Sequence, residues 1–153
     1  MLTKLKKLKE RQEGFTIIEV LIVLAIAGLI MVVVFLAVPH LEASQQNNAR
    51  DTDANNLLES VSDYESNDGG SYPTTQCTTA ACTWITYKPG QLTTYKYYPT
   101  FASAPTTVPG DTTAYLIAGA TCSGLAPVSA TTRNVVVWYG ISGSTGSKCT
   151  QSD

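Results

Sequence analysis

The sequence predicts an α+β fold, in which one long N-terminal helix packs by its second half on a small antiparallel β-sheet. Three observations lead to this prediction. Residues 20–38 are apolar apart from Gly28, an amphipathic helical pattern follows them, and from residue 71 the composition changes to Thr, Ser, Gly, Pro and Tyr. A small sheet is marginally stable until a helix covers its apolar face, and this helix is the one available.

The first half of the predicted helix fits a membrane segment. Its apolar run is long enough to span a bilayer core of about 30 Å. Lysine and arginine outnumber glutamate in the residues before it, and cationic residues beside a membrane segment stay cytoplasmic. We therefore expect a cytoplasmic basic leader at residues 1–14, a transmembrane helix and stalk at 15–50, and an extracytoplasmic head at 51–153.

The helix is expected to cover about residues 15–66. Pro39 should bend it rather than end it, because a helical pattern resumes after the proline. Residues 44–48 are polar all round, which predicts contact with water or with a neighbouring subunit. Gly69 and Gly70 supply a C-cap signal. The face predicted to pack on the sheet has the spacing i, i+3, i+4, i+7 and consists of Ala54, Leu57, Leu58, Val61 and Tyr64.

The composition after residue 71 is typical of strands and turns. Trp84–Lys88 and Gln91–Tyr98 flank Pro89-Gly90, which predicts a β-hairpin with a type II turn. Two further strands are expected at Ala114–Ala120 and Asn134–Ile141. The segments expected to be irregular are residues 100–112, 123–133 and 142–153.

All four cysteines follow the membrane segment, on the predicted outer side. An even number of cysteines in that compartment indicates disulfides, and four allow three connectivities. Cys77–Cys82 and Cys122–Cys149 are favoured because each pair brackets a local loop. A metal site is disfavoured, since there is no CxxC motif and the only histidine is distant. The sequence implies no cofactor.

The stretch Gly14–Glu19 places a glycine before an aromatic residue and a carboxylate just inside the apolar run. A charge in a membrane segment is unfavourable, so it usually has a partner and a function. An ordinary secretory signal would have a shorter apolar core, with the cleavage site after it. Here the small residue lies before the core, so cleavage after Gly14 would leave the apolar segment on the mature protein.

These residues resemble the processing and assembly signal of type IV pilins. The resemblance covers about residues 1–66, and the remainder only in its lollipop architecture. It implies that a prepilin peptidase cuts after Gly14, that Phe15 becomes an N-methylated N-terminus, and that Glu19 is the assembly glutamate. The helix-bending proline common in that family would fall near Leu36, whereas here the proline is Pro39.

The chemistry of this signal follows from charge. Cleavage creates a cationic amine at Phe15, about 6 Å along the helix from Glu19 at a rise of about 1.5 Å per residue. In a filament, the amine of an incoming subunit would neutralise Glu19 of a neighbour. Wrong registers would leave a buried charge unpaired. The alternative is a single-pass anchor whose Glu19 lies at the membrane interface.

The sequence argues against an enzyme or a nucleic-acid-binding protein. The head has no histidine, so it holds no nucleophile–base–carboxylate set, and it has no phosphate-binding loop. The net charge of residues 69–153 is +2, which is small for a nucleic-acid-binding protein, since these usually show a clear basic patch. His40 is read as an interfacial polar residue, and Asp51 and Asp53 point apart on a helix. The aromatic residues read as core and sheet-face positions are Trp84, Tyr87, Tyr95, Tyr97, Tyr98 and Trp138.

We therefore expect a structural subunit of a type IV pilus, made as a single-pass membrane precursor and polymerised into an extracellular filament. Its expected partners are other pilin subunits, the prepilin peptidase, the membrane and the pilus assembly machinery. Two alternatives stay open. One is a minor pilin or a type II secretion pseudopilin, and the other is a signal-anchored surface binding domain that never polymerises.

Overall fold

The computed structural model describes residues 14–131, 133–143 and 145–152, so the basic leader predicted before Gly14 lies almost wholly outside the described residues. The chain forms two compact units, divided between Leu41 and Glu42. This division lies earlier than the boundary expected at residues 50 and 51. The reason is that Gln46 and Asn47, expected to meet water or a neighbour, hydrogen-bond to Ser142 within the second unit.

One helix, α2 (Ile17–Asn67), begins in the first unit and ends in the second. It is continuous through Pro39, so the proline does not end it. By length and composition α2 could cross a membrane. The large apolar side chains of the part of α2 that lies in the first unit are exposed. The helix stops where Gly69 takes a φ of 68° and the Gly70 N–H donates to the Glu65 carbonyl, 2.8 Å away, which satisfies a terminal carbonyl as a C-cap does.

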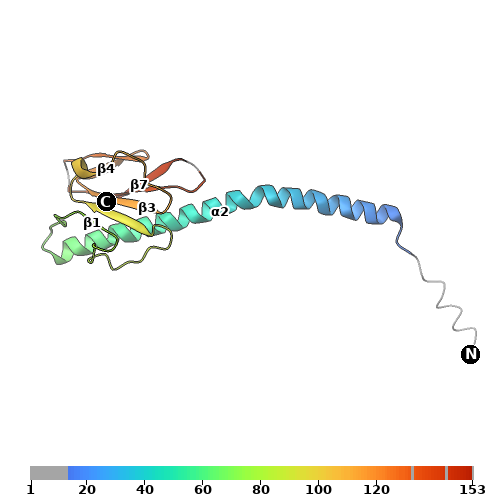
Figure 1. The fold of residues 1–153 in the computed structure, drawn as a ribbon, viewed down its shortest axis with the longest axis horizontal. Helices are drawn as coiled ribbons and strands as arrows, with labels where there is room; N and C mark the ends of the chain where they lie inside the picture. Colours follow the sequence, from blue (N-terminus) through green and yellow to red (C-terminus); the bar gives the residue numbers. More distant parts are fainter. Residues whose placement is uncertain (1–13, 132, 144, 153) are drawn as a thin grey trace, which may run out of the picture. The chain divides into compact units, whose positions relative to one another are not determined.

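The second unit contains a five-stranded sheet with the order β1-β2-β3-β6-β7 and a separate two-stranded hairpin, β4-β5. Neighbouring strands of the large sheet are antiparallel except for β2 and β3, which are parallel. The C-terminal part of α2 runs along this sheet (Figure 1). The strands are β1 (Cys77–Thr78), β2 (Thr94–Tyr98), β3 (Thr113–Ala118), β4 (Ala120–Ser123), β5 (Ala126–Ser129), β6 (Val135–Gly140) and β7 (Ser147–Gln151), and a 3-10 helix η2 spans Phe101–Ser103.

The main core lies between α2 and one face of the sheet. The predicted apolar face of α2 is buried there, except for Tyr64. The centre of the Tyr64 ring lies 5.3 Å from the centre of the Trp84 ring. Alternate residues of β2, β3 and β6 face the helix, as the two-residue period of a strand requires. The strand residues of this core are Tyr95, Tyr97, Ala114, Leu116, Ala118, Val135, Val137 and Tyr139. The predicted α+β fold, with the helix packed on a mostly antiparallel sheet, is confirmed.

The opposite face of the sheet is also buried. Ile117, Val136 and Trp138 form a second cluster there, with η2 and the β4-β5 hairpin packed against it. The hairpin is joined to the sheet by the Cys122–Cys149 disulfide and by Gln151, whose side-chain oxygen accepts from the Cys122 N–H at 2.9 Å. Burial on both faces explains why every residue of β6 is buried.

The hairpin predicted around Pro89-Gly90 is wrong, because residues 84–93 form no strand and β2 begins only at Thr94. Asp53 of α2 supplies the physical reason. Its carboxylate accepts hydrogen bonds from the backbone N–H groups of Gly90, Gln91 and Leu92, at 3.1, 2.6 and 3.0 Å. Those donors therefore bind a helix side chain instead of a strand partner.

The predicted strand at Ala114–Ala120 is two elements. Gly119, with a φ of 69°, separates β3 from β4. A second glycine, Gly124, has a φ of 64° at the first central position of a two-residue turn, which is the backbone that such a hairpin turn needs. The β4-β5 hairpin therefore replaces most of the connector expected at residues 123–133, and β7 occupies part of the tail expected at 142–153.

Two disulfides, Cys77–Cys82 and Cys122–Cys149, connect the four cysteines. These are the pairs that the loop lengths favour. Their Cα atoms lie 5.2 and 5.7 Å apart. The first closes the loop that precedes the Asp53-bound segment, and the second fixes the β4-β5 hairpin to β7.

Candidate functional site

Glu19 lies in the first turn of α2, and Thr16 immediately precedes the helix. The Thr16 backbone N–H donates to Oε2 of Glu19 at 2.9 Å, and the Thr16 hydroxyl donates to the same oxygen at 2.8 Å. In return, the Glu19 N–H donates to Oγ1 of Thr16 at 3.3 Å. This reciprocal arrangement is a capping box, in which the two residues satisfy backbone donors that have no partner inside the helix.

The capping box decides how the Glu19 carboxylate is held. Both hydrogen bonds from Thr16 end on Oε2, and no described residue donates to Oε1. Glu19 is also the only Asp, Glu, Lys or Arg between residues 14 and 41. Within the described part of this unit, its charge is therefore met by an amide and a hydroxyl, with one oxygen left available to a cation.

The capping role of Thr16 is not among the roles predicted from the sequence. The signal was present, because Thr16-Ile17-Ile18-Glu19 matches the S/T-x-x-E pattern of a capping box directly before an apolar run. The role predicted for Glu19 from the sequence is assembly alone. The structure adds a local role, in which the same carboxylate caps the helix that carries it.

Gly14 and Phe15 are both exposed, and Phe15 is 89% exposed. A Cβ built on Gly14 would have no heavy atom within 4 Å. Crowding within the described chain therefore does not require a glycine at this position. Phe15 and Glu19 border a shallow groove with Val20, Val23 and Leu24.

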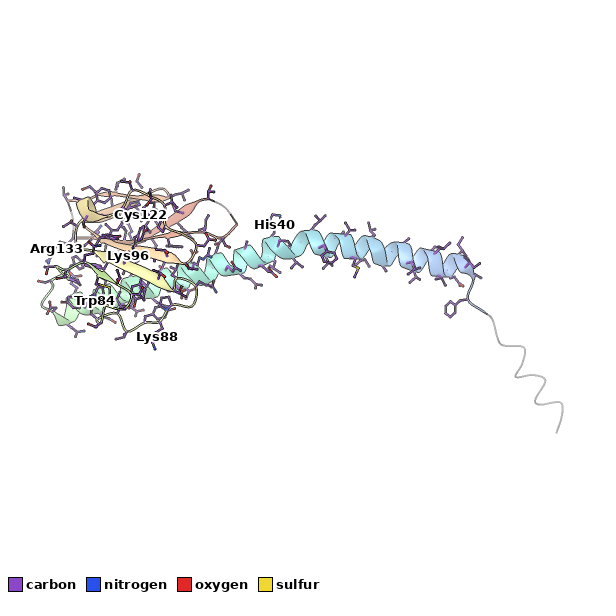
Figure 2. All side chains as sticks on the ribbon, in the orientation of Figure 1. His40, Trp84, Lys88, Lys96, Cys122 and Arg133 are labelled. Carbon is purple, nitrogen blue, oxygen red and sulfur yellow. A yellow bond between two sulfur atoms is a disulfide. The ribbon has the colours of Figure 1, made fainter. Side chains whose placement is uncertain are left out.

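The other polar candidates have structural partners. Asp51 and Asp53 point to different groups, as expected of residues two apart on a helix. Asp51 accepts from the Tyr139 hydroxyl at 2.5 Å and forms an ion pair with Lys148. Burial, and then the bond to Asp51, raise the pKa of Tyr139. His40 is exposed on α2 (Figure 2). Among the described residues, no group of three His, Cys, Asp or Glu could hold a metal ion.

Thr16→Val should loosen the start of α2, because valine keeps the shape of threonine but cannot accept from the Glu19 N–H. The expected loss is about 1 kcal/mol of local helix stability, the usual value of an N-cap. Amide hydrogen exchange of the mature protein in detergent should show faster exchange at Glu19. Thr16→Ser keeps the hydroxyl and should exchange like the wild type. Equal exchange in the valine and serine variants would contradict the capping role.

Comparison with known proteins identifies the start of the chain. Residues 9–35 match the family described as the prokaryotic N-terminal methylation motif. The matched stretch contains Gly14, Phe15 and Glu19 and continues into the apolar part of α2. No curated protein and no solved structure matches the chain. The chain thus carries a prepilin-like signal followed by a long apolar helix, which supports a precursor of the type IV pilin-like or pseudopilin kind.

Proposed function

We propose that this chain, with its methylation motif at residues 9–35, is the precursor of a structural subunit of a type IV pilus. The observation that carries the proposal is the position of a capped carboxylate, Glu19, at the start of an exposed apolar helix, four residues after the predicted new N-terminus. In this proposal the chain is inserted in the membrane as a single-pass precursor, cut after Gly14, N-methylated at Phe15, and polymerised through α2.

The processing step explains the glycine. No crowding in the described chain requires a residue without a side chain at position 14. A peptidase that admits only a small side chain next to the scissile bond would require it. The bond Gly14–Phe15 lies before α2 begins, in exposed backbone without regular secondary structure that a protease active site can reach.

The apolar half of α2 must be shielded from water both before and after assembly. An apolar surface of this size is not left in contact with water by a soluble monomer. Lipid would cover it before assembly, and the α2 helices of neighbouring subunits would cover it in the filament. Gly28 lies in the middle of this half with no atom near its Cβ position, and a small residue lets another helix approach closely.

Glu19 would then fix the register of assembly. Its Oε2 atom is held by Thr16, and its Oε1 atom is free to accept from the Phe15 ammonium of an incoming subunit. In an apolar filament core an unpaired charge is strongly unfavourable, so a displaced subunit would be penalised. The amine exists only after cleavage, which makes processing a condition for assembly.

The partners in this proposal are further copies of the chain, a prepilin peptidase, the membrane and an assembly machinery. The leader stays cytoplasmic and the second unit lies outside the cell. The protein is a building block and has no catalytic role. A minor pilin or a pseudopilin would share the processing, and a surface-anchored binding domain would share the topology but would be absent from filaments.

Gly14→Leu tests the processing step directly. The leucine side chain should block the peptidase, so full-length precursor should accumulate in the membrane, seen by immunoblot and intact mass. Filaments should be absent by electron microscopy. Gly14→Ala, with the smallest added side chain, is the matched control and should still be cut. If Gly14→Leu yields the wild-type mature mass, or if the mature chain begins beyond Val38, the proposed processing is wrong.

A further inference from the structure

The end of α2 carries a dipeptide with its own chemistry. Asp68-Gly69 is the only Asp-Gly in the chain, and no Asn-Gly occurs. Asp68 and Gly69 are exposed, and Gly69 and the following Gly70 both have positive φ, at 68° and 79°. An aspartate before a glycine is the arrangement in which the next backbone nitrogen most easily reaches the aspartate side-chain carbon, because no Cβ hinders the approach.

The hydrogen bonds around this dipeptide leave the reacting nitrogen free. The Asp68 N–H donates to the Tyr64 carbonyl at 2.9 Å, and the Gly70 N–H donates to the Glu65 carbonyl at 2.8 Å. Between them, the Gly69 N–H has no acceptor among the described residues. A Cβ at Gly69 would meet nothing within 4 Å, so the site is open. The Asp68 carboxyl forms no ion pair in the described part of the chain, and the Tyr64 hydroxyl hydrogen-bonds to it.

We propose that Asp68-Gly69 is a site of spontaneous isoaspartate formation. The Gly69 nitrogen attacks the Asp68 side-chain carbon, a new N–C bond forms, and the carboxyl oxygen leaves as water together with the nitrogen's proton. The product is a succinimide. Water then adds to the main-chain carbonyl carbon of Asp68 and breaks its bond to Gly69, which gives the isoaspartyl linkage. Addition at the side-chain carbon regenerates aspartate, and the net reaction consumes no other reagent.

The structural consequence lies at the adjacent contact between the residues that follow α2 and Arg133, which precedes β6. The Gly70 carbonyl accepts from Nη2 of Arg133 at 2.5 Å, and the Tyr72 hydroxyl donates to the Arg133 carbonyl at 2.6 Å. The Arg133 guanidinium also lies over the Tyr72 ring, 5.8 Å from its centre. Arg133 is at the end of the head where α2 stops (Figure 2). An isoaspartyl bond adds the Cβ atom of Asp68 to the main chain directly before Gly69, so it displaces the carbonyl of the following residue, Gly70.

The test follows the mature protein in detergent during prolonged warm incubation at neutral pH. Peptide mapping with electron-transfer fragmentation, and labelling by an isoaspartate methyltransferase, should detect isoaspartate at position 68. A species lighter by one water should precede it. The internal controls are Asp63 and Asp111, which precede bulkier residues and should stay unchanged. Asp68→Glu should abolish the product.

A synthetic peptide of residues 64–72 gives the reference rate. We expect Asp68 of the folded protein to convert within the time that the peptide needs. The Gly70 amide, which donates to the Glu65 carbonyl, should then be less protected against hydrogen exchange. If the peptide converts and Asp68 of the folded protein stays wholly α-linked, the helix end blocks the attack and the proposal fails.

Discussion

Cells that produce Glu19→Ala should hold normal amounts of cleaved subunit in the membrane and form few or no filaments. The substitution makes the membrane segment more apolar, so insertion should be equal or better. The bond between Gly14 and Phe15 is untouched, so processing should continue. The partner of the incoming Phe15 ammonium is lost, and this cation would enter an apolar filament core without a counter-charge. Immunoblots of membrane fractions and electron microscopy of sheared filaments measure the two halves of this result.

Two companion variants separate charge from capping at Glu19. Glu19→Gln keeps an oxygen that can accept from Thr16 but removes the charge, so it should insert and cap the helix yet assemble poorly. Glu19→Asp keeps the charge with a shorter reach and should be intermediate. Abundant filaments from the alanine and glutamine variants would exclude charge pairing as the assembly mechanism. Loss of membrane insertion in either would show that Glu19 is needed before assembly.

Asp53→Asn should cause the largest loss of stability in the second unit. Asp53 is 4% exposed, and its carboxylate accepts from three backbone N–H groups and from the Tyr87 hydroxyl at 2.7 Å. An asparagine offers one acceptor oxygen and turns an NH₂ group toward buried donors. A buried donor left without a partner costs about 1–3 kcal/mol, so we expect a loss on the order of 3 kcal/mol.

Urea unfolding of the mature protein in detergent, followed by the fluorescence of Trp84 and Trp138, measures the loss at Asp53. Both tryptophans lie in the second unit. The matched control is Asp63→Asn, an exposed aspartate on the same helix, which should change the midpoint little. Equal midpoints for the two variants would show that Asp53 does not hold residues 84–93 in place.

The contribution of Asp53 should depend on pH. Burial raises the pKa of Asp53, but the hydrogen bonds from Leu92, Tyr87, Gln91 and Gly90 lower it by more, so it lies below its ordinary value. A carboxyl with a lower pKa in the folded than in the unfolded state stabilises the fold above the unfolded pKa, and this stabilisation is lost as pH falls through the folded pKa. The stability difference between wild type and Asp53→Asn should therefore shrink below about pH 4.

The parts of the fold that can be predicted from the sequence are those set by the spacing of apolar residues and by the length of an apolar run. The apolar run predicts the first half of α2, and the spacing of Ala54, Leu57, Leu58 and Val61 predicts the helix face in the core. Residues 84–93 show where such patterns fail. Their composition is typical of strands, but Asp53, far away in sequence, binds their backbone donors. No local pattern reveals which loop a helix carboxylate will meet.

The candidate site also has a part that the sequence predicts and a part that only the structure shows. Gly14, Phe15 and Glu19 are visible in the sequence because the signal is local. The spacing of Thr16 and Glu19 also indicates the capping contact. That both Thr16 donors bind Oε2 and leave Oε1 without a donor is visible only in the structure. The parallel pairing of β2 with β3 depends on the path of a long connection, which composition does not encode.

The most direct test of the central claim is N-terminal mass spectrometry of protein from sheared surface filaments. This chain should be present, it should begin at Phe15, and the Phe15 amine should carry a methyl group. Filaments that lack the chain, or a filament protein that begins at Met1 or beyond Val38, would contradict it.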